Sequence, residues 1–167
     1  MEIVLVHPEI PQNTGSTARL AAGIAVRLHL VEPIGFSLDS KHLKRAGLDY
    51  WPDVDMTVHA DWHSLVEHLA GGSTRPVPER LRLFTARGGA SLFETDFRSD
   101  DILVFGSESK GLPETLLAQS PERRVRVPTR DSVRSLNLAN IVCLGAYVAL
   151  QHSGELERIE RDIDGSD

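Results

Sequence analysis

Short apolar runs alternate with helix-like segments along most of the sequence, and this alternation restricts the fold more than any other feature. Each run has the length and composition of a buried β-strand. The runs are residues 3–6, 28–31, 56–58, 81–85, 102–105 and 125–127. Because helices that connect such strands make parallel crossovers, the sequence predicts an α/β fold with a mainly parallel sheet.

The helices that we expect between these strands have recognisable starts. Asn13 and Asp39 are typical capping residues, and Pro113 is tolerated in a first helical turn. The predicted helices cover residues 14–26, 40–46, 61–69 and 137–152, with a further helix that begins at Pro113. Residues 71–78 are rich in turn formers and predict a mobile connector. We expect one domain over residues 1–153 and an acidic C-terminal tail over residues 154–167, either helical or disordered.

The charge of the chain bears on its partners. A formal net charge of −6 at pH 7 argues mildly against RNA binding, because neutralisation of phosphates dominates the affinity of proteins for nucleic acids. Part of the acid lies in the tail, however, and local basic patches decide partners more than net charge does. The basic residues gather in two clusters, which are Lys41, Lys44 and Arg45, and Arg123, Arg124, Arg126, Arg130 and Arg134.

The single cysteine, Cys143, excludes an internal disulfide and favours a reducing cytoplasm. It lies in an apolar run, so we expect a small buried side chain there. The N-terminus has neither a positive leader nor a long apolar stretch, and we expect no signal peptide and no membrane span. The seven histidines lack the spacing of a metal site, and we expect no metal.

Ligands of parallel sheets bind at the carboxyl ends of strands, so the loops that follow the strands are candidate sites. The first such loop, residues 11–19, enters a helix whose free amides suit an anion. Arg19 lies about one and a half turns into that helix and faces either the site or the solvent. The glycines of a dinucleotide fingerprint are missing, which weakens the case for a nucleotide-binding oxidoreductase. The plain alternative is a capped helix with an exposed arginine.

The second loop runs from Gly106 to Gly111, and its glycine spacing is that of a triphosphate-binding loop. Leu112 and Pro113 follow where such a loop needs lysine and serine or threonine, so we exclude a nucleotide triphosphatase. The serines also miss the pattern of a hydrolase nucleophile. A tight strand–loop–helix connection remains, with one carboxylate, Glu108, and with backbone groups that can face a planar ligand. A plain glycine turn is the alternative.

The third loop follows the strand at residues 125–127 and leads into an apolar helix. Asn137 and Asn140 lie at the start of that helix. Buried amides need hydrogen-bond partners, and asparagines at a helix entry usually hold the backbone of a loop. Simple capping explains Asn137, but it explains the whole polar stretch less well.

Taken together and in this order, four segments resemble the SPOUT RNA methyltransferases, most closely the small branch that methylates the wobble ribose of tRNA. The segments are residues 8–15 with Arg19, residues 45–50, residues 105–113 and residues 134–140. The resemblance covers the chain from Ile3 to about Gln151. It implies an α/β fold with a C-terminal trefoil knot, which no periodicity reveals because knots are rare exceptions to the rules of topology.

The resemblance also implies an activity. A member of this branch transfers a methyl group from S-adenosylmethionine (SAM) to a ribose 2′-hydroxyl of tRNA, at the wobble cytidine or uridine of the anticodon stem-loop. It works in the cytoplasm as a homodimer, with the last helix in the interface. The cofactor-binding residues implied by position are Phe84, Thr85, Gly88, Gly106, Glu108, Gly111, Val127, Ser135, Leu136 and Asn140.

The residues that the resemblance implies for catalysis are Arg19, Asn13, Glu108 and Ser135. A guanidinium keeps its proton at ordinary pH, so we expect Arg19 to orient a phosphate or the ribose rather than to act as a base. Glu108 either faces the positive cofactor or holds a loop, and the asparagines support the geometry. Two alternatives stay open, an RNA base methyltransferase of the same fold and a non-catalytic module that binds SAM or RNA.

Overall fold

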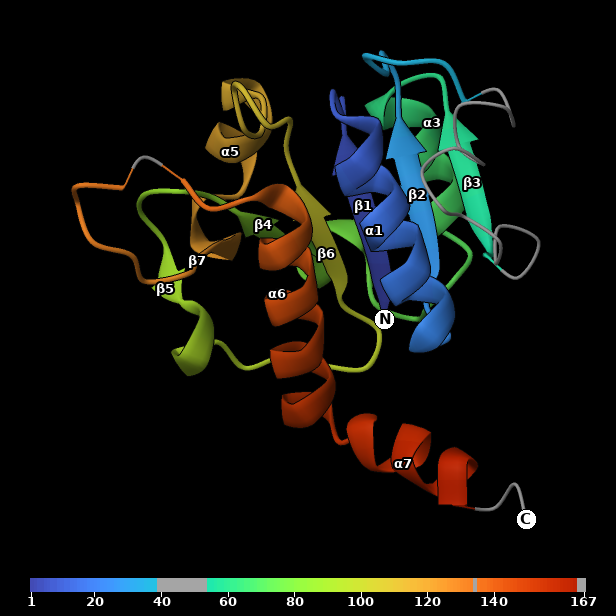
Figure 1. Ribbon diagram of the computed structural model, residues 1–167. Coiled ribbons are helices and arrows are strands. Elements are labelled where there is room, and N and C mark those ends of the chain that lie inside the picture. The colour runs from blue at the N-terminus through green and yellow to red at the C-terminus, as the bar shows by residue number, and fades with distance from the viewer. Residues whose placement is uncertain (39–53, 134, 165–167) are drawn as a thin grey trace.

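A seven-stranded sheet forms the centre of the molecule, in the order β3-β2-β1-β6-β4-β7-β5. The computed structural model describes residues 1–38, 54–133 and 135–164 (Figure 1). The strands are β1 (Glu2–Val6), β2 (Arg27–Val31), β3 (Met56–His59), β4 (Leu81–Phe84), β5 (Ala90–Ser91), β6 (Ile102–Phe105) and β7 (Arg124–Arg126). Every pair of neighbouring strands in this sheet is parallel. The prediction of an α/β fold with a mainly parallel sheet is therefore confirmed.

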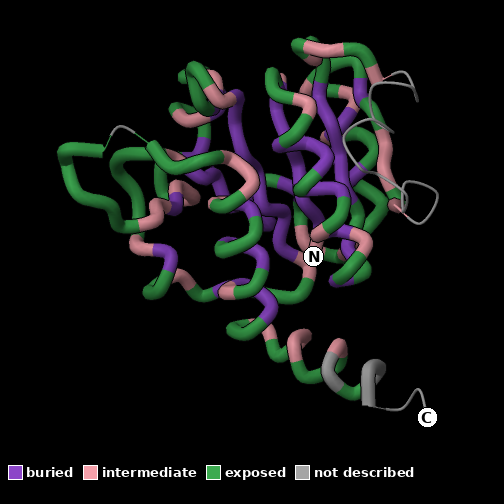
Figure 2. The backbone as a smooth tube through the Cα atoms, in the orientation of Figure 1, coloured by how far each residue is buried: buried purple, intermediate pink, exposed green. Residues whose placement is uncertain are grey.

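Helices cover both faces of the sheet (Figure 1). The helices are α1 (Pro11–Gly23), α3 (Trp62–Leu69), α4 (Val77–Arg80), α5 (Glu114–Gln119), α6 (Leu138–Ser153) and α7 (Leu156–Asp164), with 3₁₀ turns at η2 (Leu92–Glu94) and η3 (Pro121–Arg123). Alternate residues of each strand point to opposite faces. Ile3 and Leu5 accordingly pack in one apolar cluster with α1 and α6, whereas Val4 and Val6 pack in another with α3 and α5. The buried strands between the two layers form the purple centre of Figure 2.

Two predicted helix starts differ from the structure. α1 begins at Pro11 and ends at Gly23, and its N-cap is Ile10, whose side chain makes no capping hydrogen bond. Asn13 is buried inside the first turn, so its predicted capping role was wrong. Proline at the first helical position needs no N–H partner, which lets the helix start earlier than Asn13. Pro113 is the N-cap of α5 and not its first residue.

The start of α6 agrees with the sequence. The Asn137 side chain accepts a hydrogen bond from the Asn140 N–H at 3.3 Å, which confirms simple capping at this end. Cys143, by contrast, is exposed, so the expected burial was wrong. An apolar helix covers the core with one face only, and Cys143 lies on the other face.

The predicted connector at residues 71–78 is anchored by side chains. Ser73 Oγ donates to Asp100 at 2.7 Å, and Arg75 forms ion pairs with Asp100 and Asp101. Its last residues form part of α4. Composition alone predicted mobility here because the two carboxylates that hold the segment come from a distant part of the sequence.

Several predictions fall on residues outside the described ranges. These are the helix over residues 40–46, the basic cluster Lys41, Lys44 and Arg45, the segment 45–50, and Arg134. The C-terminal region is helical as α7, and its residues Leu156 and Ile159 pack against the main core. None of the helices in the described ranges has both the length and the apolar character that crossing a bilayer requires.

A buried polar cluster lies under the β1–β2–β3 part of the sheet. Glu2 Oε2 is 2.8 Å from His29 Nε2, and His29 Nδ1 is 3.0 Å from His59 Nε2. Arg80 donates to Glu2 Oε1 at 3.0 Å. Burial, followed by the nearby charges of His29 and His68, lowers the pKa of His59. Burial acts to raise the pKa of Glu2, but the hydrogen bond and the charges of its partners outweigh it, so the pKa of that carboxyl is lowered.

Candidate active site

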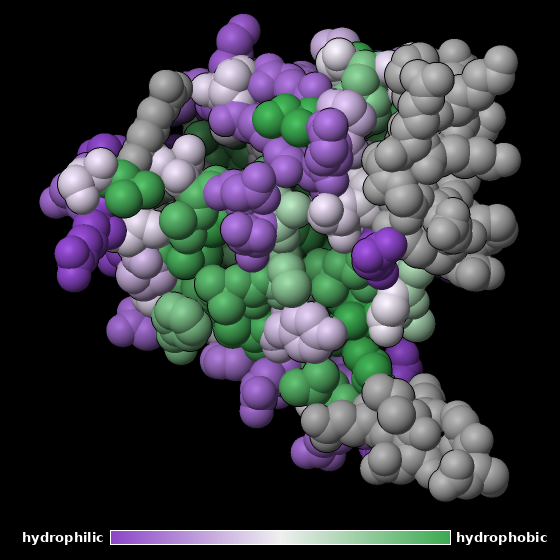
Figure 3. All heavy atoms as spheres, viewed as in Figure 1, coloured by the Kyte–Doolittle hydropathy of each residue, from purple (hydrophilic) through white to green (hydrophobic). Residues whose placement is uncertain are grey.

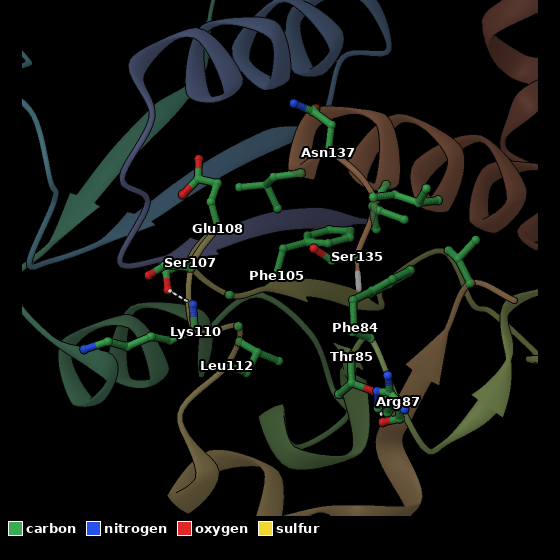
Figure 4. A pocket seen from close by; sticks show the side chains of 18 of the residues that line it. Phe84, Thr85, Arg87, Phe105, Ser107, Glu108, Lys110, Leu112, Ser135 and Asn137 are labelled. Atoms are coloured by element: carbon green, nitrogen blue, oxygen red, sulfur yellow. Dashed lines mark hydrogen bonds between the residues drawn. The ribbon is translucent and has the colours of Figure 1, made fainter. Parts of the chain in front are cut away.

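A pocket of about 620 Å³ opens at the carboxyl ends of β4, β6 and β7 (Figure 4). Its walls are three loops, at residues 84–87, 106–112 and 127–138, together with the start of α1. This is the edge of the sheet at which ligands of parallel α/β proteins bind. The volume suits a molecule of the size of a cofactor.

Most of the predicted site residues line this pocket. They are Asn13, Phe84, Thr85, Gly106, Glu108, Gly111, Val127, Ser135 and Leu136. Three others do not line it: Gly88 belongs to a smaller neighbouring pocket, Asn140 is exposed on the first turn of α6, and Arg19 is exposed on α1. The structure thus brings the three predicted loops together, and the roles assigned to single residues stay predictions.

Two stacked aromatic rings lie beside the pocket. The Phe84 and Phe105 ring centroids are 4.3 Å apart with a 28° angle between the planes. α6 approaches this stack closely, because a Cβ atom at Gly145 would come within 2.8 Å of the Phe84 ring. Phe105 was not among the predicted site residues. Its place as the last residue of a predicted strand was the signal that could have identified it.

The loop after β6 is closed on itself. Ser107 and Gly111 exchange two backbone hydrogen bonds, of 3.2 and 2.8 Å, and the Ser107 hydroxyl accepts from the Lys110 N–H (Figure 4). Gly111 has a φ of 71°, which favours glycine. A Cβ atom at Gly106 would lie 2.0 Å from the carbonyl carbon of Gly111. Both glycines are therefore required by the backbone conformation of this loop.

Glu108 holds this loop against the start of α1. Its carboxylate accepts hydrogen bonds from the Glu9 N–H at 2.8 Å, the Ile10 N–H at 3.2 Å and Asn13 Nδ2 at 3.0 Å. In return, Glu9 accepts from the backbone N–H and the hydroxyl of Ser109, at 3.0 and 2.7 Å. A carboxylate is also favourable beside a helix N-terminus. Of the two roles that the sequence left open for Glu108, these contacts favour holding a loop.

The asparagines extend this link to the third loop. Asn13 Oδ1 accepts a hydrogen bond of 2.9 Å from Asn137 Nδ2, while Asn137 Oδ1 caps α6. Asn13 is buried and uses both ends of its amide, one toward Glu108 and one toward Asn137. A continuous set of hydrogen bonds therefore joins all three segments that the sequence singled out. Sequence reasoning expected the asparagines to support a loop but gave no signal of which residues would pair.

The remaining walls are chemically mixed. The apolar part includes Leu112, Val127, Leu136 and Ile141, and cationic side chains lie at Arg87 and Lys110. Ser135 also lines the pocket, on an exposed stretch before α6. Within the described ranges, no group of three or more histidine, cysteine, aspartate or glutamate side chains is arranged to hold a metal ion.

The fold and the pocket define a class, an α/β protein whose cofactor-sized site is made by loops after three parallel strands. Comparison with known proteins then places this chain within that class. The chain belongs to the SpoU rRNA methylase family, whose profile matches residues 1–147.

The chain is similar to proteins of several bacteria. It is 46% identical over 153 residues to a tRNA (cytidine(34)-2′-O)-methyltransferase of Burkholderia cenocepacia, which covers 91% of this chain and 95% of that protein. It is 38% identical over 163 residues to the protein of that description in Escherichia coli, with 97% and 99% covered. A solved structure that concerns the 2′-OH methylation of C/U34 on tRNA superimposes with a TM-score of 0.81 at 48% identity, covering 90% of this chain and 94% of the other.

Proposed function

We propose that the protein transfers a methyl group from SAM to the ribose 2′-hydroxyl of nucleotide 34 of tRNA, a cytidine or a uridine. The observation that carries this proposal is the pocket, because three of the four segments on which the methyltransferase resemblance rests, residues 8–15, 105–113 and 134–140, contribute to its walls. The similarity to the two tRNA methyltransferases extends over at least nine tenths of this chain and of each relative, and so includes the whole pocket.

The residues of the pocket fit the proposed cofactor. SAM combines a flat adenine, a ribose, a positively charged sulfonium and an amino acid end, and needs a site with both apolar and polar walls. Leu112, Val127, Leu136 and Ile141 supply apolar surface, and Gly106 lets the backbone of Gly111 pack against it and close the loop. We assign the binding of the cofactor to these residues together with Phe84, Thr85, Gly111 and Ser135. The predicted contributions of Gly88 and Asn140 would need contacts outside the pocket walls.

When bound, SAM supplies an electrophilic methyl carbon. In the proposed transfer, the ribose oxygen would take the methyl group in place of the cofactor sulfur, which would be left as a neutral thioether, and the hydroxyl proton would pass to solvent water. The task of the protein is to hold the oxygen in line behind the methyl carbon at about 3–3.5 Å. The hydrogen-bonded set of Glu108, Asn13 and Asn137 serves this task by fixing the pocket walls before the substrate arrives. The Arg19 guanidinium would donate hydrogen bonds that orient a phosphate or the ribose of the incoming nucleotide.

The exposed face of α6 supports the proposed homodimer. Leu144 and Tyr147 are 37% and 44% exposed, and hydrophobic side chains gather over this helix in Figure 3. Exposed apolar surface of this kind marks protein–protein contacts. Leu136 and Ile10 at the pocket rim are exposed apolar residues as well. A second copy that covers the face of α6 and these two residues would therefore place its own surface close to the pocket. The C-terminal knot and the division into residues 1–153 and 154–167 belong to the same proposal.

The test is methyl transfer from labelled SAM to tRNA isolated from cells that lack the protein, followed by mass spectrometry of the nucleosides and of ribonuclease fragments that contain position 34. We expect a 2′-O-methylated nucleoside at position 34. A methylated base would favour the RNA base methyltransferase, and binding of SAM or RNA without turnover would favour the non-catalytic module.

Arg19→Ala tests the predicted catalytic arginine, and Arg27→Ala is its matched control. Arg27 is also exposed, and it pairs with Asp55 far from the pocket. We expect Arg19→Ala to abolish transfer and Arg27→Ala to retain it. Equal activity of the two variants would remove Arg19 from the mechanism.

A further inference from the structure

A second pocket, of about 270 Å³, adjoins the first. It lies between the loop after β4 and the loop after β7, and the two pockets share Ala86, Arg87, Val127 and Thr129 as lining residues. In Figure 4, Thr85 and Arg87 lie together at one end of the large pocket, away from Glu108 and Asn137. A ligand group in the second pocket would therefore be next to the cofactor site, on the side opposite to the start of α1.

Three arginines line the second pocket: Arg87, Arg126 and Arg130. Asp131 is the one carboxylate among the lining residues. Across the described ranges, none of the three guanidinium groups forms an ion pair or a hydrogen bond with another residue.

Several other arginines of the described chain are held by partners. Ion pairs join Arg75 to Asp100, Arg80 to Glu2, and Arg82 to Asp101. In the second basic cluster of the sequence, Arg123 lies 3.5 Å from Glu122, and Arg124 donates to the Leu117 carbonyl. The structure thus separates arginines that stabilise the protein from arginines that face a pocket without a partner.

The two loops that carry these arginines are held next to each other. The Thr85 hydroxyl bonds to the carbonyls of Arg87 and Gly88, at 2.8 and 3.2 Å, which fixes the turn. Gly89, with a φ of 83°, presses against β7 so closely that a Cβ atom there would lie 2.4 Å from the Arg124 carbonyl oxygen. Glycines and Thr85 therefore fix the backbone around the second pocket, and this backbone holds the arginines of the two loops next to each other.

Guanidinium groups match phosphate oxygens in geometry and charge. A protein with a net charge of −6 repels a polyanion at long range, so a local basic site is needed for it to bind RNA. We propose that Arg87, Arg126 and Arg130 form a subsite for a phosphodiester group of the RNA strand beside the nucleotide that is methylated. That the ligand is tRNA rests on the proposed function. That the site binds an anion rests on the residues of the second pocket alone.

The anion has two possible sources, since SAM also carries a carboxylate. The experiment therefore measures RNA and SAM separately. Arg126→Gln and Arg130→Gln remove one charge each, and Arg98→Gln is the matched control, because Arg98 is exposed and lies outside both pockets. Affinity for a fluorescent tRNA transcript is measured by anisotropy over a range of salt concentrations, and affinity for SAM by calorimetry.

We expect each pocket variant to weaken tRNA binding about tenfold at low salt and to reduce the slope of log Kd against log salt by about 0.7, the value for one phosphate contact on a single strand. SAM affinity should stay within twofold of the wild-type value. Arg126→Lys and Arg130→Lys should restore much of the salt slope, since charge is retained. Arg130 is exposed in a loop, so its variants should unfold at the wild-type temperature and report binding alone.

Two outcomes would overturn the inference. The first is tRNA binding in the pocket variants equal to that of Arg98→Gln. The second is a loss of SAM affinity with tRNA affinity unchanged, which would assign the pocket to the cofactor carboxylate. A wild-type protein that binds tRNA with the expected slope but does not methylate it would contradict the proposed function and leave the anion subsite supported.

Discussion

Glu108→Gln is the substitution that best separates the two roles left open for this residue. The substitution preserves size and removes the charge. One carboxylate oxygen accepts from the Glu9 N–H, and the other accepts from the Ile10 N–H and from Asn13 Nδ2. Whichever way the new amide turns, its NH₂ group faces at least one N–H donor, so at least one hydrogen bond between the second loop and α1 is lost.

The expected loss of stability follows from these contacts. One hydrogen bond contributes about 0.5–1.5 kcal/mol net, and a carboxylate beside a helix N-terminus contributes about 0.3–1 kcal/mol. The free energy of unfolding should therefore fall by roughly 1–2.5 kcal/mol. In a domain of this size each kcal/mol shifts Tm by about 2–4 °C, so Tm should drop by roughly 2–10 °C. SAM should bind more weakly, because the loop that forms one wall of the pocket is less firmly held.

The assay is thermal unfolding without ligand, followed by calorimetric titration with SAM and by methyl transfer. Glu94→Gln is the matched control, since Glu94 is exposed in η2 and has no ion pair or hydrogen bond within the described part of the chain. The reasoning would be refuted by a Glu108→Gln protein with the Tm and SAM affinity of this control but without methyl transfer. Glu108 would then act directly on the substrate.

Three further predictions follow from the packing and the charges. Gly106→Ala should abolish SAM binding, because the added Cβ meets backbone 2.0 Å away, whereas Gly23→Ala, with nothing within 4 Å, should bind normally in calorimetry. Folding lowers the pKa of His59, so below about pH 6.5 the unfolded chain binds a proton at this histidine more readily than the folded chain does. The free energy of unfolding should therefore fall as the pH drops through this range. Equal midpoints of urea unfolding at about pH 7.5 and 5.5 would contradict this. In a double-mutant cycle by urea unfolding, Asn13→Ala and Asn137→Ala should be less damaging together than the sum of the two, by at least about 0.5 kcal/mol; strict additivity would mean that their hydrogen bond contributes nothing.

The sheet could be predicted from sequence because each long strand is a short apolar run between turn-forming residues. β5 was missed because two residues, Ala90 and Ser91, carry no hydrophobic pattern. The start of α1 was misplaced for a different reason. Asn13 has the chemistry of a cap, but the N–H groups of Glu9 and Ile10 before the helix are satisfied by Glu108, which lies 99 and 98 residues away from them, respectively. Local patterns do not contain such long-range partners.

The candidate site, too, could be predicted from the sequence only in part. Strand ends and the family resemblance were enough to identify the three loops and most of the residues that line the pocket. The direction in which a side chain or a loop backbone faces was not predictable, which is why Gly88 and Asn140 were assigned to the cofactor although they do not line the large pocket. Arg87 and Lys110 line it without having been predicted, since an arginine or a lysine in a loop gives no local sign of what it faces.

The hydrogen bond that Asn13 donates to Glu108 and the one that it accepts from Asn137 span 95 and 124 residues of sequence. During synthesis, the buried amide of Asn13 can therefore form both hydrogen bonds only after almost the entire polypeptide has left the ribosome. A chain truncated before α6 would lack one wall of the pocket and the hydrogen bond between Asn137 and Asn13. Recognition of SAM by this architecture would then act as a check on completeness, because only chains made nearly to the end could hold the methyl donor.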